Sequence, residues 1–360
     1  MSEDKKRTGQ TDGDRRRLGR FWLTVFVVAP AVILGGLAWK AILLRFRSAG
    51  AQLAAIEAAR AIPESEDAGT AYVRLASEYL PLPQYPRVAD NNTLLRTVRE
   101  PWLSRDHTEL AAWIDERQDL MSKLLDISEL EQCRLPIPSD IRQTSYFTNP
   151  IRQMRGWSYL LVRSANMDVA EGRIDAAIEK YRCVLRMGAH LRQQSTLDSY
   201  NGGAVMQYQH VRPVKQLVIE KELTDEQLTV IEAAVLAADE SWKTHLKRMV
   251  RVQMLLGRRG RPRLKDWREY WDHRRRTNEA DAKALERAHR SRLRVLAGRC
   301  EMCILIALRR FKNKTGHWPR SLDQIEPQLS RETLTDPRSN TPFIYELEGE
   351  NFKLHSKEAD

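Results

Sequence analysis

The sequence has few cysteines, and their scarcity excludes a fold held together by disulfides. Its 360 residues include only four cysteines, at positions Cys133, Cys183, Cys300 and Cys303. Disulfide-built domains are much richer in cysteine. Cys300 and Cys303 form a C-x-x-C pair, but both fall on the apolar stripe of a predicted helix, which favours buried thiols. A disulfide among the four, or metal or redox chemistry at the pair, is the alternative.

Catalytic and nucleotide-binding motifs are also absent. The sequence contains no G-x-S-x-G, H-E-x-x-H, G-x-x-x-x-G-K-[ST] or G-x-G-x-x-G. The eight histidines lie on separate segments, and none has a second ligand at metal-binding spacing. We therefore assign no catalytic, cofactor-binding or metal-binding residue and expect no cofactor. An enzyme is the least favoured class, although catalytic groups can converge from distant segments without a motif.

One long apolar run is present, at residues 21–44. No charged residue lies between Phe21 and Trp39. A helix over the whole run is about 36 Å long, because each residue adds about 1.5 Å, and this exceeds the roughly 30 Å of a bilayer core. The run is also longer than the apolar part of a cleaved signal peptide. We predict an uncleaved, single-pass transmembrane helix at 21–44, with the lipid bilayer as its partner.

The basic residues beside this run predict its orientation. Seven lie in residues 1–20, and four lie on the far flank, at Lys40 near the end of the run and at Arg45, Arg47 and Arg60 after it. The side with more positive charge stays in the cytoplasm. We expect a disordered basic cytoplasmic tail at 1–20, and the remainder of the chain outside the cytoplasm, held to the cytoplasmic (inner) membrane.

Apolar spacing of three and four residues dominates the rest of the chain and predicts a mainly α fold. We expect a juxtamembrane helix within 45–62 and a helical domain over 63–242. A capping box, Thr224 with Gln227, predicts the start of one helix. The expected helices of this domain cover residues 64–79, 108–130, a hairpin at 151–194, 197–220 and 225–239.

The hairpin at 151–194 turns at Gly172 and has a repeat-like pattern in its second helix. Ala177, Tyr181, Val184 and Leu185 follow the order small residue, aromatic residue, packing pair. This resembles the tetratricopeptide family over about 34 residues. An ordinary antiparallel helix pair is the alternative, because about three repeats are needed to bury a continuous face.

Positive charge is concentrated in the basic region, residues 243–282, and continues to residue 299. Residues 243–299 contain 19 lysines and arginines against six acidic residues. A solvated helical face is one interpretation, and contact with anionic lipid or another polyanion is the second. Nucleic acid is a third and is disfavoured by the predicted location. The candidate polyanion contacts are Arg258, Arg259, Arg261, Arg263, Lys265, Arg274, Arg275 and Arg276.

The last segment, 283–356, is predicted to be a small α+β unit. A long helix (278–314) precedes a short helix (320–329) and two strands (343–348 and 351–356) that turn at Gly349. A motif runs through this segment at Gly316, Trp318, Pro319, Leu322, Asp336, Pro337, Pro342, Tyr345 and Leu354. With these residues the segment resembles the C-terminal part of type II secretion pseudopilins. The whole layout also resembles uncharacterised bacterial single-pass membrane proteins.

The start of the apolar run departs from the pseudopilin pattern. Prepilin processing needs a glycine directly before the run and a glutamate at its fifth position. Here Gly19 is followed by Arg20, and the fifth residue is Val25.

We therefore predict a membrane-anchored interaction or scaffold protein with protein partners in the cell envelope. A polyanion-binding module and a pseudopilin-like component of a secretion system are the alternatives.

Overall fold

The computed structural model describes residues 49–79, 85–86, 90–137, 150–236, 242–259 and 267–356, with the backbone alone for 257–259, 267–278 and 281. The chain forms two compact units, residues 1–56 and 57–360, and each is considered by itself. In the first unit, residues 49–56 are helical. The predicted tail and transmembrane helix, 1–20 and 21–44, lie outside the described residues. Within the described part of the chain, no helix is both long and apolar enough to cross a membrane.

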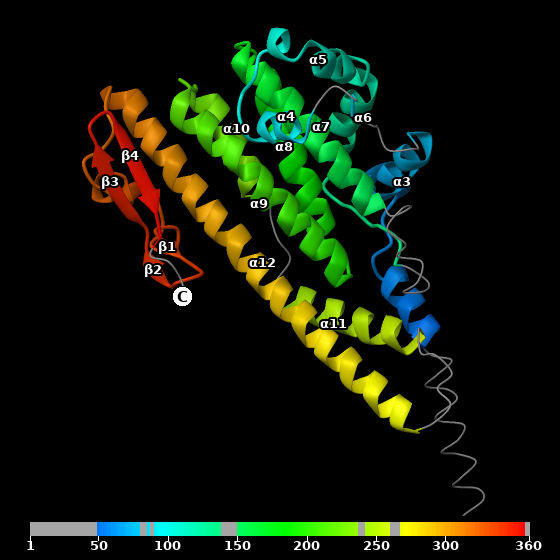
Figure 1. The fold of residues 1–360 in the computed structure, drawn as a ribbon. Helices are drawn as coiled ribbons and strands as arrows, with labels where there is room; N and C mark the ends of the chain where they lie inside the picture. Colours follow the sequence, from blue (N-terminus) through cyan, green and yellow to red (C-terminus); the bar gives the residue numbers. More distant parts are fainter. Residues whose placement is uncertain are drawn as a thin grey trace, which may run out of the picture. The chain divides into compact units, whose positions relative to one another are not determined.

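The second unit is mainly helical, as predicted, and the path of its helices can be followed in Figure 1. Its first elements are η2 (Glu64–Glu66), α3 (Ala68–Glu78), α4 (Asn91–Arg99), η3 (Ser104–Asp106), α5 (Thr108–Asp115) and α6 (Gln118–Ser128). The following helices are α7 (Pro150–Ala170), α8 (Ile174–Arg192), α9 (Leu197–Glu220), α10 (Asp225–Val235), α11 (Trp242–Arg259) and α12 (Trp267–Thr315).

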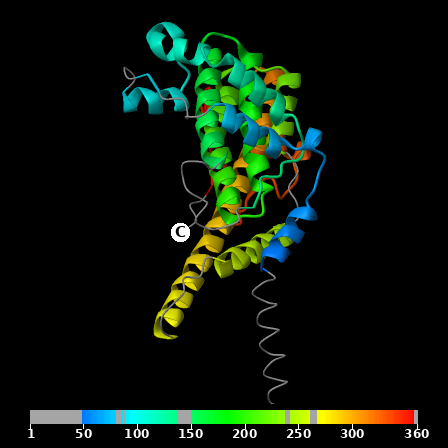
Figure 2. The same ribbon diagram turned by 90° about the vertical axis from the view of Figure 1, so that its right-hand side faces the viewer.

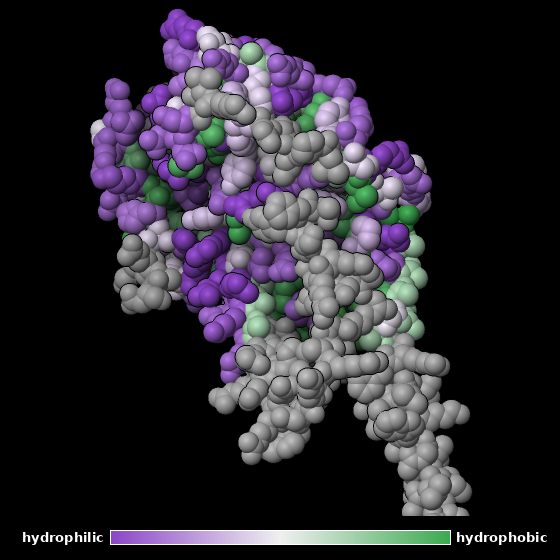
Figure 3. All heavy atoms as spheres, turned by 45° about the vertical axis from the view of Figure 1, so that its right-hand side comes forward, coloured by the Kyte–Doolittle hydropathy of each residue, from purple (hydrophilic) through white to green (hydrophobic). Residues whose placement is uncertain are grey.

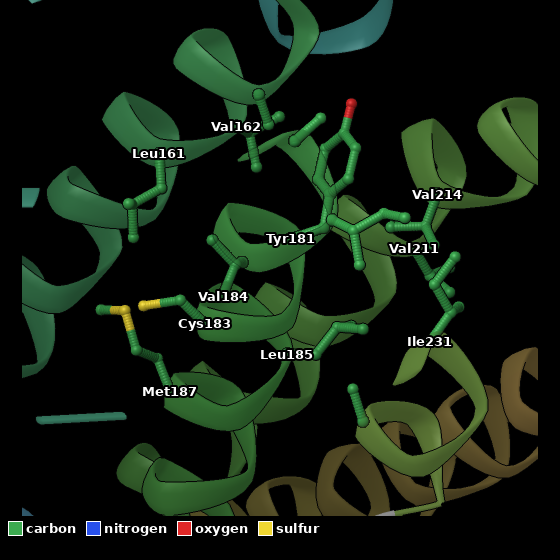
Figure 4. Packing of buried hydrophobic residues seen from close by; sticks show 14 of the residues in the cluster. Leu161, Val162, Tyr181, Cys183, Val184, Leu185, Met187, Val211, Val214 and Ile231 are labelled. Atoms are coloured by element: carbon green, nitrogen blue, oxygen red, sulfur yellow. The ribbon is translucent and has the colours of Figure 1, made fainter. Parts of the chain in front are cut away.

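Helices α7, α8, α9 and α10 enclose the centre of the core. Helix α8 packs against the other three, and Figure 4 shows their apolar side chains meeting around Val184 and Leu185. The predicted hairpin of α7 and α8 is confirmed, with its turn at Gly172, where φ is 80°. The predicted capping box is also present, with the Thr224 side chain accepting from the Gln227 backbone N–H. The spacing of apolar residues therefore identified this part of the fold.

Two facing glycines, Gly188 of α8 and Gly203 of α9, allow the two helices to approach closely. A Cβ atom on Gly203 would lie 2.7 Å from Leu191 Cβ and 2.9 Å from the Arg192 backbone nitrogen, and closer still to the Gly188 carbonyl oxygen. Real Cβ contacts are longer than this, so no larger residue fits at position 203 unless the backbone shifts. The crossing of α8 and α9 depends on this absence of a side chain.

The predicted helix at 108–130 is wrong as a single element. The structure has two helices, α5 and α6, separated by a turn at residues 116–117. In one continuous helix Ile114 and Leu120 would point about 120° apart, because each residue turns the chain by about 100°. Both side chains are fully buried, and the turn is what brings both into the core. Helix α4 was not predicted at all.

Helix α12 is longer than the predicted 278–314. It begins at Trp267, and residues Met302 to Leu308 are buried where it packs against α9 and α10. Figures 1 and 2 show its N-terminal half extending past the end of α9 and lying beside α11. Few apolar residues mark that half, so apolar spacing could not reveal where the helix starts.

The two predicted strands are confirmed as an antiparallel hairpin, β3 (Ile344–Glu348) and β4 (Asn351–His355), with Gly349 at φ 63° in the turn. A smaller pair, β1 (Thr335–Asp336) and β2 (Thr341–Pro342), precedes it. The short helix predicted at 320–329 is instead two 3-10 turns, η5 (Leu322–Gln324) and η6 (Glu326–Gln328). Pro327 lies inside this segment and has no N–H for an α-helical hydrogen bond.

Candidate functional site

The candidate site is a groove between α4, α7 and α9, with a volume of about 930 Å³. Leu95 of α4 and Tyr208 of α9 line it, and they are 56% and 49% exposed. On the face shown in Figure 3, hydrophilic residues cover most of the described surface, and hydrophobic residues form small separate patches. Leu95 and Tyr208 are two of the nine large apolar side chains that are exposed among the described residues, and these two line the same groove.

Helix α4 forms one wall; its N-terminus is capped, and its C-terminal part is hydrogen-bonded to α7. The Asp90 side chain caps its N-terminus by accepting from the Thr93 backbone N–H at 2.5 Å. Asn166 of α7 donates from its side chain to the Thr97 carbonyl oxygen at 2.8 Å. Asn166 in turn accepts from the Tyr181 hydroxyl of α8. The wall is thus bonded to the core of the unit.

Arg163 of α7 lies at the floor of the groove and is only 5% exposed. Its Nε donates to Thr97 Oγ1 at 3.2 Å, and one Nη donates to the Leu94 carbonyl at 2.8 Å. Its other Nη donates to the Tyr85 hydroxyl at 2.9 Å and, at 3.4 Å, to the Tyr159 carbonyl. The guanidinium carbon is 4.6 Å from the Tyr85 ring centroid, within cation–π range.

Every acceptor around Arg163 among the described residues is neutral. Burial lowers the pKa of Arg163, but an arginine keeps its charge in proteins. A buried charge is costly when no opposite charge accompanies it. The cations Arg99, Arg212 and Lys215 also line the groove, whereas Glu301, paired with Lys215, is the single acidic side chain among the described lining residues. The groove is therefore electropositive.

His210 of α9 adds an unused acceptor. Ser158 Oγ lies 2.8 Å from the Arg155 carbonyl and 3.0 Å from His210 Nε2. When the serine proton points to that carbonyl, Nε2 carries the ring proton and Nδ1 is an acceptor; Nδ1 is buried with no partner among the described residues. Burial, aided by nearby arginines, lowers the pKa of His210 to about 3, so the ring is neutral.

A second acceptor comes from the backbone of α9. Pro213 lies inside the helix and lacks the N–H that would bond the Gln209 carbonyl four residues earlier. Both residues line the groove. The site therefore combines a buried cation, acceptors that need donors, and exposed apolar side chains. Such a set is complementary to an anionic group next to N–H groups. In the described part of the chain, no cluster of three metal-ligating side chains occurs.

The structure gives less information on the predicted polyanion contacts. Arg258 and Arg259 lie in α11, and Arg274, Arg275 and Arg276 lie in α12, in stretches where only the backbone is described. Arg261, Arg263 and Lys265 lie outside the described residues. The structure thus places two groups of these residues on helices, α11 and α12.

The four cysteines do lie in the described part of the chain, and all are free. Cys133, Cys183 and Cys303 are buried, whereas Cys300 is partly exposed, so only one of the C-x-x-C pair is fully on the buried face. Burial raises the pKa of Cys183 to about 12 and that of Cys303 to about 11. These thiols are protonated at neutral pH and have little nucleophilic character.

Sequence reasoning missed every residue of the groove. The available signal was a single arginine within an otherwise weakly charged helix, since α7 has no other basic residue between Trp157 and Ala170. Comparison with known proteins adds no assignment, because no family model, curated protein or solved structure matches this chain.

Proposed function

We propose that this chain is a membrane-anchored interaction or scaffold protein that binds an acidic, partly apolar peptide segment of a partner protein in the α4–α7–α9 groove. The observation that carries the proposal is Arg163, a buried cation with only neutral acceptors around it on the floor of an open groove. A ligand carboxylate would supply the missing opposite charge.

A peptide fits the remaining features better than a small inorganic anion does. Its backbone N–H groups can donate to the Gln209 carbonyl, which lacks the N–H of Pro213. Its apolar side chains can cover Leu95 and Tyr208, whose exposed surface would leave water on binding. A volume of about 930 Å³ accommodates several residues. The groove therefore requires a peptide segment that carries one or more Asp or Glu residues beside apolar residues.

The predicted transmembrane helix at 21–44 supports the location of this activity. It would anchor the chain in a bilayer, with the bulk of the chain outside the cytoplasm, so partners in the cell envelope are the expected targets. Tethering both partners to one membrane raises their effective concentration, and a single groove of modest affinity then suffices for association.

Site-specific photo-cross-linking in native membranes tests the proposal. A photoreactive phenylalanine derivative replaces Leu95 in the groove or, as the matched control, Leu236, which is similarly exposed and does not line the groove. We expect position 95 to capture a partner, with the cross-link mapping to a segment that carries Asp or Glu next to apolar residues. Capture through a neutral or basic segment, or equal capture at position 236, would refute the proposal.

A further inference from the structure

The N-terminal half of α12 carries a row of exposed basic side chains, here called the α12 basic stripe: Lys283, Arg287, Arg290 and Arg294. Successive residues of an α-helix are about 100° apart, so these four lie within an arc of about 60°. They extend over roughly 16 Å of helix at about 1.5 Å per residue. The stripe is therefore narrow, straight and of one charge sign.

The opposite side of the same helical segment is the packed side. Ala284, Leu285 and Ala288 meet Leu246 and Met249 of α11 in an apolar cluster. This packing fixes the rotation of α12, so the stripe faces away from α11. None of the four side chains of the α12 basic stripe belongs to this apolar cluster.

Little acidic charge offsets the stripe. Arg290 lies 3.6 Å from Glu286 in an ion pair that is exposed on both sides, and exposed pairs of this kind contribute little. Lys283, Arg287 and Arg294 make no ion pair with any residue that the structure describes. Arg294 does lie 5.9 Å from the Tyr208 ring, which leaves its charge available.

We infer that the α12 basic stripe is a contact surface for an anionic bilayer. A straight row of charges on one side of a helix matches a flat surface of lipid phosphates, since all four can reach it together. The predicted transmembrane helix at 21–44 would anchor the chain in a membrane. The site is also distinct from the arginines predicted from the sequence at 258–276.

Residue-resolved arginine labelling of the full chain tests this inference. The chain is incorporated in vesicles of phosphatidylcholine alone, or of phosphatidylcholine with about one third phosphatidylglycerol, and treated with phenylglyoxal before mass spectrometry. Arg287, Arg290 and Arg294 are expected to react at least fivefold more slowly with the anionic lipid, and the difference should vanish in 1 M salt, where screening acts within about 3 Å. Exposed Arg320 and Arg331 are the internal controls.

A pair of variants with equal charge change completes the test. Arg287→Glu with Arg290→Glu should abolish the protection of Arg294, whereas Arg320→Glu with Arg331→Glu should leave it intact. All four positions are exposed, so neither variant threatens the fold. Equal labelling in both kinds of vesicle would overturn the inference. Protection by a DNA duplex added to the neutral vesicles, without protection by phosphatidylglycerol, would overturn it in favour of nucleic acid.

Discussion

Replacing Gly203 by alanine should destabilise the second unit, because this glycine sets the distance between α8 and α9. The new Cβ would meet Leu191 Cβ at 2.7 Å and two backbone atoms of α8. Relieving such overpacking costs about 3 kcal/mol, at the upper end of the usual range, because backbone rather than a flexible side chain must move. Alanine offsets about 1 kcal/mol of this through its higher helix propensity. The expected loss is about 2 kcal/mol.

Gly202→Ala is the matched control, one residue earlier in the same helix. Its Cβ would have one close neighbour, the Ile151 Cγ2 methyl at 3.2 Å, which can move. Gly202→Ala should therefore leave stability unchanged or raise it by up to about 1 kcal/mol. Urea unfolding, monitored by circular dichroism, gives the midpoint urea concentration of each variant. The midpoints report stability directly when the dependence of the free energy of unfolding on urea is the same for both. Equal midpoints for the two variants would refute the close approach of α8 and α9.

Two further predictions concern titration and thiol reactivity. Burial lowers the pKa of His190 to about 4 and that of His210 to about 3, below the ordinary value of 6.5. Protons therefore bind the unfolded chain preferentially, and the free energy of unfolding decreases as the pH falls from about 6.5 toward 4. Each histidine should lower the free energy of unfolding by on the order of 2 kcal/mol between pH 7 and pH 4.5. In urea unfolding, His210→Gln should show a smaller decrease of this free energy over the same pH range; an equal decrease would contradict the burial of His210. Iodoacetamide with mass spectrometry should label Cys300 first, and Cys133 and Cys183 only after unfolding; early labelling of Cys183 would contradict the packing of α8.

The elements that could be predicted from the sequence are those with a local pattern. The α7–α8 hairpin, the capping box at Thr224 and the β3–β4 hairpin each depend on spacing within one segment. The break between α5 and α6 depends on which neighbours bury Ile114 and Leu120, which no local pattern contains. The groove was missed for the same reason, because Arg163, Thr97 and His210 come from three helices that meet only in the folded unit.

The neutral surroundings of Arg163 could not be foreseen either. An arginine in a helix is usually an exposed residue, and the isolation of Arg163 among uncharged neighbours in α7 does not by itself show that it is buried. Its neighbours Tyr85 and Leu94 lie far away in the sequence. By contrast, the positive charge of residues 243–299 was evident from composition, but only the structure showed that Lys283, Arg287, Arg290 and Arg294 share one exposed side of α12.

The most direct test of the account is a peptide-display selection on the full chain, followed by affinity measurements on the enriched peptides. We expect the enriched peptides to combine Asp or Glu with apolar residues. Arg163→Gln should weaken their binding by about 10-fold to 100-fold, the loss of one charge-assisted hydrogen bond, and the exposed Arg212→Gln should weaken it less without altering the fold. Arg320→Gln should change nothing. Enrichment of peptides without acidic residues, or unchanged affinity in the folded Arg163→Gln variant, would contradict the account.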